Sequence, residues 1–222
     1  MKSSESTANG KEVPSSVVTK LTVLGATGSI GLNTLEIVRQ FPHKFKIEAL
    51  SCRSSLERLV QQIKEFQPRL VCVDNSEQAR ELRETFLNGC SGPETEIVWG
   101  EEGLVQISSD PEVDLVVAGI VGAAGLQPTF SAVQAGKIVA VANKEPLVMA
   151  GELFVQTAKN TGAKLLPTDS EHNAIFQVLH DEPPERIARL FLTASGGPFR
   201  DLPLQEFEKI TLAEALDHPN WK

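Results

Sequence analysis

The sequence predicts an α/β fold that is built on a doubly wound parallel sheet. Three observations lead to this prediction. Short apolar runs alternate with stretches of helical periodicity, the runs are apolar throughout rather than at every second position, and a glycine-rich turn follows the first run. Alternating strands and helices are typical of parallel βαβ units. Strands that are apolar on both faces are covered by helices on both sides.

The elements follow in order from residue 20. Residues 21–25 (LTVLG) form the first predicted strand, and the helix over 29–41 carries Leu35, Val38 and Phe41 on one stripe. Ser54 and Glu57 have the spacing of a capping box in front of the next helix. The predicted strands lie at 21–25, 46–52, 70–74, 96–99, 114–119 and 137–142, with helices at 29–41, from 56, from 76 and at 127–135.

The pattern becomes less regular after Asn143. The predicted elements are a helix over 147–160, a strand at 164–168, a helix near 172–179, a strand at 186–194 with partial alternation, and a short helix that starts at Thr211–Glu214. The strand at 186–194 needs partners, and little sequence remains to supply them. We therefore expect a domain at 20–165, an incomplete α+β domain at 166–222, and a chain that ends inside this second domain.

Composition limits the classes of function. The 222 residues carry a net charge of −8, which argues against nucleic-acid binding, and no apolar run has membrane-spanning length. Cys52, Cys72 and Cys90 lack CxxC spacing, as expected of reduced cytosolic thiols. Residues 1–19 are polar and Ser-rich, which predicts a disordered tail and excludes a secretory signal; an organellar transit peptide is the weaker alternative.

The glycine-rich turn reads GATGSIG at 25–31, with Gly25, Gly28 and Gly31 at GxxGxxG spacing. Glycine allows the backbone to approach a pyrophosphate, and the N-terminus of the helix offers free N–H groups. Thr27 and Ser29 add hydroxyl donors. A plain tight turn is the alternative, but the position between the first strand and the first helix favours dinucleotide binding.

The end of the second strand distinguishes NAD from NADP. An NAD site places an acidic residue there, against the ribose 2′-hydroxyl. This chain has Arg53, Ser54 and Ser55 instead, a set that suits a 2′-phosphate and favours NADPH. Arg53 as a solvated loop residue and Ser54 as a helix cap are the alternatives, and Ser54 can have both roles.

Two further groups lie at strand ends. The small residues of 119–125 (GIVGAAG) suit close passage of a nicotinamide ribose or, equally, close packing of a helix on a strand. Asn143, Lys144 and Glu145 follow the strand at 137–142, where open α/β sheets bind ligands. Lys144 and Glu145 are therefore candidates for contact with cofactor and substrate, and a surface charge pair is the alternative.

Two carboxylates flank Ser170. If the strand at 164–168 stays extended, Asp169 and Glu171 face the same side, where a divalent cation relieves their repulsion. Oxygen ligands favour Mg²⁺ or Mn²⁺ over zinc. Equally, Ser170 and Glu171 start a helix that Asp169 caps.

The last part of the chain has two candidate ligand segments. Ser195 and the glycines of 195–200 (SGGPFR) suit an anion-binding nest, with a loop turn as the alternative. His218 and Trp221 (HPNW at 218–221) suit a lid over a substrate, with a helix stop before Pro219 as the alternative.

Together these motifs resemble the 1-deoxy-D-xylulose 5-phosphate reductoisomerases. The resemblance runs from about Lys20 to the end of the chain, in the family's order and spacing, and its motifs are GATGSIG, AGIVGAAG (118–125), ANKE (142–145), DSEHNAIFQ (169–177), SGGPFR and HPNW. It implies a Rossmann-like NADPH domain and a partial catalytic domain. The implied reaction is the NADPH-dependent rearrangement and reduction of 1-deoxy-D-xylulose 5-phosphate to 2-C-methyl-D-erythritol 4-phosphate in non-mevalonate isoprenoid biosynthesis, with Mg²⁺ or Mn²⁺ as Lewis acid.

The resemblance also implies residue roles. The matching cofactor contacts are Thr27, Gly28, Ser29, Ile30, Asn143 and Glu145. At the end of the second strand, this chain has Arg53, Ser54 and Ser55 where some members of the family have Gly-Lys-Asn. The matching metal ligands are Asp169 and Glu171. The matching substrate contacts are Lys144, Ser170, Glu171, Ser195 and His218, of which Lys144 and Glu171 are the catalytic candidates, and Trp221 matches the lid.

The family's chains continue past HPNW with a third metal-binding Glu and a helical domain, so we expect this sequence to be about the N-terminal half. The resemblance further implies a homodimer and a phosphorylated sugar as substrate, whereas the net charge and the absence of a membrane-spanning apolar run argue against a nucleic-acid or membrane partner. A bacterial cytoplasm is the expected location, with a plastid as the alternative. The competing functions are an NADP-binding fragment without turnover and another aldehyde reductase or semialdehyde dehydrogenase, a class that usually needs a catalytic Cys.

Overall fold

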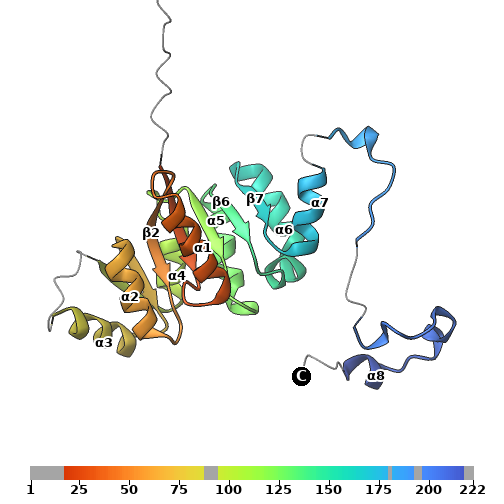
Figure 1. Ribbon diagram of the computed structural model, residues 1–222, viewed down its shortest axis with the longest axis horizontal. Helices are drawn as coiled ribbons and strands as arrows, with labels where there is room; N and C mark the ends of the chain where they lie inside the picture. The colour runs from red at the N-terminus through yellow and green to blue at the C-terminus, as the bar shows by residue number, and fades with distance from the viewer. Residues whose placement is uncertain (1–17, 88–94, 180–181, 193–196, 218–222) are drawn as a thin grey trace, which may run out of the picture. The chain divides into compact units, whose positions relative to one another are not determined.

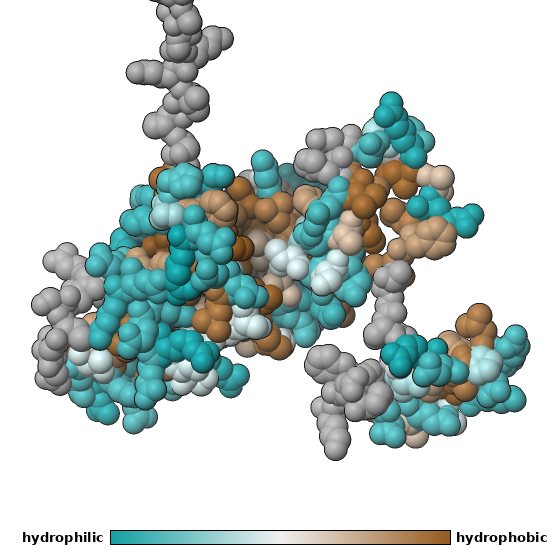
Figure 2. All heavy atoms as spheres, in the orientation of Figure 1, coloured by the Kyte–Doolittle hydropathy of each residue, from teal (hydrophilic) through white to brown (hydrophobic). Residues whose placement is uncertain are grey.

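The structure is a computed structural model that describes residues 18–87, 95–179, 182–192 and 197–217. The chain divides into two units, residues 1–168 and 169–222 (Figure 1). Among the described residues, no helix is long and apolar enough to cross a membrane. The face of the first unit in Figure 2 is mainly hydrophilic.

The first unit contains a seven-stranded sheet in the order β4-β3-β2-β1-β5-β6-β7, and every neighbouring pair is parallel. The strands are β1 (Thr19–Leu24), β2 (Phe45–Ser51), β3 (Leu70–Val73), β4 (Glu96–Trp99), β5 (Leu115–Ala118), β6 (Ile138–Val141) and β7 (Lys164–Pro167). The helices are α1 (Ser29–Gln40), α2 (Leu56–Phe66), α3 (Ser76–Leu87), α4 (Gly100–Ser109), α5 (Leu126–Gln134) and α6 (Glu145–Thr161). The predicted doubly wound parallel sheet is confirmed.

Each face of the sheet has its own apolar core. On one face, strand residues such as Val23 pack with Leu35 of α1 and Leu59 of α2. On the other face, Leu24 and its neighbours pack with Ile107 of α4 and Phe154 of α6. Adjacent residues such as Val23 and Leu24 point to opposite faces of a strand. This explains why the strands are apolar throughout: burying a large aliphatic side chain contributes about 1.5–3 kcal/mol on either face.

Helix α4 is absent from the predicted elements. Its sequence GEEGLVQISS has few apolar residues, so its periodicity is weak. A Cβ on Gly103 would lie 3.0 Å from Cys72 Sγ and 3.1 Å from Val98 Cγ2, so glycine allows α4 to pack directly on β3 and β4. Glu101 and Glu102 occupy its first turn, where acidic residues favour a helix.

The second unit contains α7 (Ser170–Val178), α8 (Leu212–Leu216) and three 3₁₀ turns, Pro184–Arg186, Gly197–Phe199 and Leu204–Lys209. None of its side chains whose burial is described is buried. The predicted helix at Thr211 is confirmed as α8. Its capping box is complete, because Glu214 N donates to Thr211 Oγ1 (3.3 Å) and Thr211 N donates to Glu214 Oε2 (2.8 Å).

The predicted strand at 186–194 is wrong over its described part. Arg186 ends a 3₁₀ turn and residues 187–192 have no regular structure. Leu190, Phe191 and Leu192 are 56%, 74% and 64% exposed. A strand forms only against a partner, and the described residues of this unit contain no other strand.

Candidate functional site

The strand order reverses at β1, because β2 and β5 lie on its two sides and lead in opposite directions. In open α/β sheets, this reversal leaves a crevice at the carboxyl ends of the strands, where ligands bind. A pocket of about 690 Å³ lies there, a size typical of cofactor sites. Its lining includes Gly25, Thr27, Gly28, Arg53, Ser54 and Gly119.

The turn after β1 requires glycine. Gly25 has φ of 77°, and a Cβ there would lie 3.1 Å from the carbonyl oxygen of Gly119. A Cβ on Gly31 would lie 2.5 Å from both Ala26 Cα and the Gly25 oxygen. The first turn of α1 therefore lies directly on the loop, and its N–H groups lie at the end of the loop. Gly28 is the N-cap of α1 and supplies no side-chain cap.

The turn is also held from the side of β2 and α2. Ser51 accepts from Gly25 N through Oγ (2.9 Å) and from Ala26 N through its carbonyl oxygen (2.8 Å). Gln62 Nε2 donates to Ala26 O at 2.9 Å, and Arg58 Nη1 donates to Thr27 O at 2.8 Å. These contacts fix the backbone that surrounds the predicted pyrophosphate position.

Ser51, Arg58 and Gln62 are absent from the residues that the sequence predicted for the site. Arg58 and Gln62 are four residues apart on α2, so a shared helical face was predictable. The sequence does not show which loop that face contacts, because that depends on the packing of α2 against β1.

The end of β2 differs from the prediction in one detail. Ser55, not Ser54, is the N-cap of α2, and it makes no side-chain cap bond. Ser55 N donates to Cys52 Sγ at 3.2 Å, and the helix begins one residue later. Glu57 is therefore the second helical residue rather than the third, and the predicted Ser54–Glu57 capping box is wrong.

Arg53 and Ser54 line the pocket from this loop. The Arg53 side chain is 86% exposed, and its Nε lies 3.8 Å from Asp74 Oδ1. Ser54 is exposed. The end of β2 thus presents a cation and hydroxyls without an acidic residue of its own.

Asn143 holds the loop after β5 in place with two hydrogen bonds. Its buried side chain donates from Nδ2 to Ile120 O (2.6 Å) and to Gly122 O (3.1 Å). A Cβ on Gly119 would lie 2.9 Å from Leu24 O, so close packing explains at least this glycine. Lys144 is the exposed N-cap residue of α6 and Glu145 is its first residue.

In the second unit, the carboxylates lie at a helix start rather than on an extended strand. Strand β7 ends at Pro167 and α7 begins at Ser170, so the strand geometry of Asp169 and Glu171 is wrong and the helix alternative is confirmed. Asp169 is the N-cap residue, but its side chain makes no cap bond. Its Oδ1 lies 3.8 Å from His172 Nδ1.

A hard divalent cation fits this donor set only in part. Two carboxylates within the first turn are oxygen ligands of the kind that Mg²⁺ prefers, and Mg²⁺ commonly takes one or two carboxylates with water and substrate oxygens. Among the residues that the structure describes, there is no group of three or more His, Cys, Asp or Glu side chains that could hold a metal ion. Ser195, His218 and Trp221 lie outside the described residues.

The thiols that line the pocket do not suit nucleophilic catalysis. Cys52 and Cys72 are both buried. Burial raises the pKa of Cys72 to about 12, so it remains a protonated thiol at neutral pH. Both cysteines are buried, so neither is placed to attack a substrate as a semialdehyde dehydrogenase requires. Cys90 lies outside the described residues.

A doubly wound parallel sheet with a glycine turn and a pocket at its switch point defines a Rossmann-like α/β unit. Residues 21–151 match the family model described as 1-deoxy-D-xylulose 5-phosphate reductoisomerase, and residues 165–222 match that of its C-terminal domain. The chain belongs to the 1-deoxy-D-xylulose 5-phosphate reductoisomerase family.

Relatives and solved structures agree with this membership. The reductoisomerase of Shouchella clausii is 48% identical over 91% of this chain and 52% of its own length, and that of Geobacter metallireducens is 49% identical with the same coverage. A solved DOX-P reductoisomerase in complex with NADPH, fosmidomycin and magnesium has a TM-score of 0.74 at 43% identity, over 92% of this chain and 52% of the other. The chain spans about half the length of the curated relatives that it matches.

Proposed function

We propose that this chain is the cofactor-binding and metal-binding part of a 1-deoxy-D-xylulose 5-phosphate reductoisomerase. Such an enzyme rearranges 1-deoxy-D-xylulose 5-phosphate and reduces the product with NADPH to 2-C-methyl-D-erythritol 4-phosphate. The observation that supports this most is the pocket of about 690 Å³ at the glycine turn, in a chain of this family.

The proposed cofactor contacts follow from the geometry of this pocket. The glycine turn brings Thr27, Gly28, Ser29 and Ile30 to the start of α1, where free N–H groups suit a pyrophosphate. Ser54 and Ser55, with a nearby arginine such as Arg53, suit a ribose 2′-phosphate. Asn143 holds the loop after β5, and Glu145 starts α6, where we place the nicotinamide end.

The remaining proposed roles concern metal and substrate. Asp169 and Glu171 would supply carboxylate oxygens to Mg²⁺ or Mn²⁺, and the bound cation would act as a Lewis acid on substrate oxygens. Lys144, Ser170 and Glu171 would contact the substrate, with Lys144 and Glu171 as the catalytic candidates. Ser195 and His218 complete the proposed substrate contacts from outside the described residues.

For the whole protein we propose a homodimer that acts on a phosphorylated sugar in the bacterial cytoplasm. The relatives given above are bacterial proteins. A second candidate function is NADPH binding without turnover, which the coverage of 52% of the relatives' length favours for these 222 residues alone.

Turnover separates the two candidates. NADPH absorbance is followed with 1-deoxy-D-xylulose 5-phosphate and Mn²⁺, for this chain and for the same chain continued to the length of its relatives. We expect turnover in the continued chain, and NADPH binding in both. Absence of turnover from both would contradict the reductoisomerase.

The metal assignment has its own test. In the continued chain, Asp169→Asn should lower both Mn²⁺ affinity and turnover, whereas Asp217→Asn, an exposed carboxylate after α8, should change neither. Unchanged Mn²⁺ affinity in Asp169→Asn would leave Asp169 as a helix N-cap residue only.

A further inference from the structure

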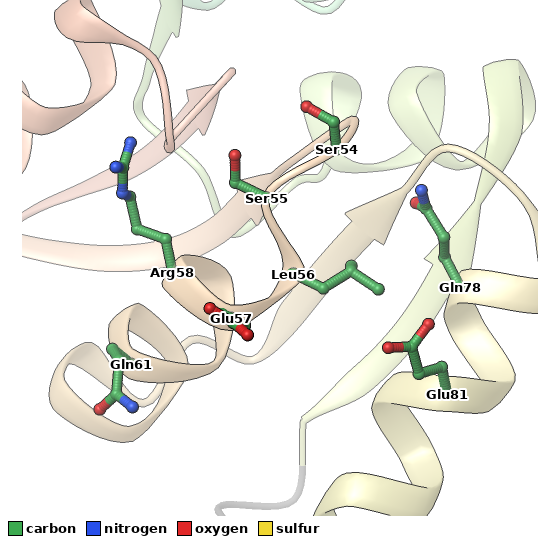
Figure 3. A pocket seen from close by; sticks show the side chains of 8 residues that line it. All are labelled: Ser54, Ser55, Leu56, Glu57, Arg58, Gln61, Gln78 and Glu81. Carbon is green, nitrogen blue, oxygen red and sulfur yellow. The ribbon is translucent and has the colours of Figure 1, made fainter.

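A second hollow adjoins the proposed dinucleotide pocket at the N-terminus of α2. It has a volume of about 870 Å³, and its lining includes Ser54, Ser55 and Arg58 together with Glu57 and Glu81 (Figure 3). Ser54 lines both the hollow and the pocket. In the Rossmann arrangement the adenosine ribose points its 2′ position at the end of the second strand, which is where these residues lie.

Arg58 is already held in place at this position. Its Nη1 donates to Thr27 O at 2.8 Å, which fixes the guanidinium beside the glycine turn. A guanidinium carries five N–H donors in a planar fork, so donors remain for a phosphate. In Figure 3 its guanidinium and the hydroxyls of Ser54 and Ser55 point to the same side of the loop, away from the carboxylates of Glu57 and Glu81.

Arg53 differs from Arg58 in the contacts that its side chain makes. Its side chain is 86% exposed, and its Nε lies 3.8 Å from Asp74, itself a residue of the pocket lining. Over the described residues, Arg58 has no ion pair with an acidic side chain, whereas Arg53 has one. Both arginines are exposed. A phosphate at Arg53, however, would compete with Asp74 and would have to order a side chain that, unlike that of Arg58, is not hydrogen-bonded to the glycine turn, which costs conformational entropy.

We infer that Arg58, rather than Arg53, gives this chain its preference for a 2′-phosphorylated dinucleotide. The inference rests on the proposed function, because it concerns the same cofactor. Arg58 would contact the 2′-phosphate with the N–H groups that it does not use on Thr27. Ser54 and Ser55 would add hydroxyl donors from the loop.

The test measures the dissociation constants of NADPH and NADH, by fluorescence of the reduced nicotinamide, for the full chain and its variants. Arg58→Gln should raise the Kd of NADPH roughly 10- to 100-fold, as expected for a lost charge-assisted hydrogen bond, and that of NADH by less than about threefold. Arg58→Lys keeps the charge without the fork and should retain part of the preference. Arg53→Gln should lower the preference less than Arg58→Gln does.

Lys64→Gln is the matched control, because it removes one positive charge from an exposed position of the same helix. It should leave the NADPH to NADH ratio as in the parent chain. If Arg58→Gln does not fold, a reduced ratio in Arg58→Lys supports the inference and an unchanged ratio overturns it.

If Arg58→Gln folds, two outcomes overturn the inference while leaving the proposed function intact. In one, Arg58→Gln weakens NADPH and NADH equally, so that Arg58 only holds the turn. In the other, Arg53→Gln removes the preference and Arg58→Gln does not. If the parent chain binds neither dinucleotide, the proposed function fails and the inference fails with it.

Discussion

Gly31 illustrates how a single residue determines the site. A methyl group at this position would lie 2.5 Å from backbone atoms of Ala26 and Gly25, neither of which is the end of a flexible side chain. We expect Gly31→Ala to destabilise the chain by about 1–3 kcal/mol, as overpacking does. It should also weaken NADPH binding, since the turn has to move away from α1. Urea unfolding and NADPH titration measure the two effects.

Gly151→Ala is the control for this prediction. Gly151 lies in α6 directly after a kink at Ala150, where φ is −145° and ψ is 27°, and an added Cβ there meets no atom within 4 Å outside its own helix backbone and chain neighbours. Alanine is a better helix former than glycine by about 0.5–1 kcal/mol, so this variant should be as stable as the parent or more so. Equal loss of stability in both variants would contradict the steric argument for Gly31.

Glu65 should contribute to the pH dependence of stability. Its pKa lies below the ordinary value of 4.5, because Arg39 donates to its carboxylate. A depressed folded pKa stabilises the protein above the ordinary pKa, and this contribution is lost as pH falls through the folded pKa. The pair is about 40% exposed, so we expect less than about 1 kcal/mol.

Glu65→Gln should therefore flatten the decline of the unfolding free energy below about pH 4.5 and leave its shape above about pH 6 unchanged. Urea unfolding over this range measures the difference. High salt should reduce it, because exposed ion pairs are screened. If the unfolding free energy falls equally at low pH in the parent and the variant, the Arg39–Glu65 pair does not contribute to stability.

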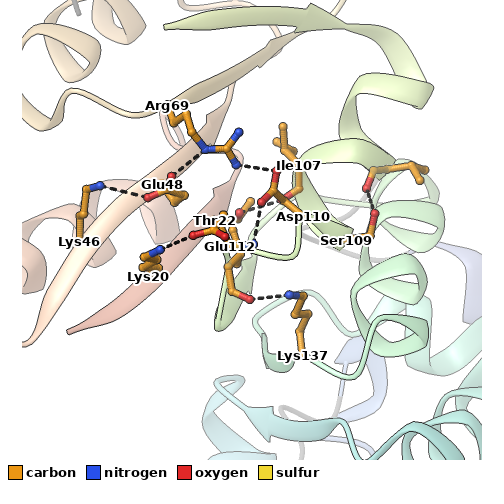
Figure 4. Close-up of polar contacts among 12 residues, drawn as sticks. Lys20, Thr22, Lys46, Glu48, Arg69, Ile107, Ser109, Asp110, Glu112 and Lys137 are labelled. Carbon is orange, nitrogen blue, oxygen red and sulfur yellow. Dashed lines mark hydrogen bonds and ion pairs between the residues drawn. The ribbon is translucent and has the colours of Figure 1, made fainter. Parts of the chain in front are cut away.

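Among the elements, a network of charged side chains joins β2 and the start of β3 to the end of α4 (Figure 4). Glu48 of β2 is buried, and it accepts from Arg69 Nε at 2.8 Å. Lys46 Nζ lies 3.2 Å from its other oxygen, and Arg69 Nη2 donates to Asp110 at 2.6 Å. The pKa of Arg69 is raised, because it donates to Asp110 and, secondarily, to Glu48. This network links β2 and β3 to the end of α4.

Arg69→Met should destabilise the chain by about 3 kcal/mol, since it leaves the buried Glu48 carboxylate without its main partner. Adding Glu48→Gln to Arg69→Met should recover part of the loss, because it removes the buried charge. Urea unfolding measures both. Breaking the exposed Lys20–Glu112 pair with Glu112→Gln should have a much smaller effect. No recovery in the double variant would contradict the charge argument.

The elements also show what was predictable. Strands such as β1 and β5 were predicted within one or two residues, because both of their faces are buried and their sequence is apolar throughout. Helix α4 was not predicted, because the residue at its contact with β3 is a glycine, Gly103, and not a large apolar residue that would mark a helical stripe. The strand predicted at 186–194 does not appear over 187–192, because alternation creates a strand only when a partner is present.

At the scale of the whole molecule, the two units differ in how far their side chains are buried. The first has a core on each face of its sheet, whereas the described residues of 169–217 include no buried side chain. We expect hydrogen exchange to be slowest in β1 and β5, at the centre of the sheet, and fast in the described part of the second unit. Exchange measured by mass spectrometry on the intact chain tests this. Comparable protection in both units would contradict it.

The sequence by itself determined the doubly wound sheet, the glycine turn and the family, because apolar runs, glycine spacing and motif order are local properties of the chain. Only the tertiary structure decided that Asp169 and Glu171 lie at a helix start, since the sequence suited a strand and a helix equally. It also decided that Arg58 and Gln62 hold the glycine turn. The physical reason is that these contacts join positions more than thirty residues apart, and only the packing of α2 beside β1 brings them together.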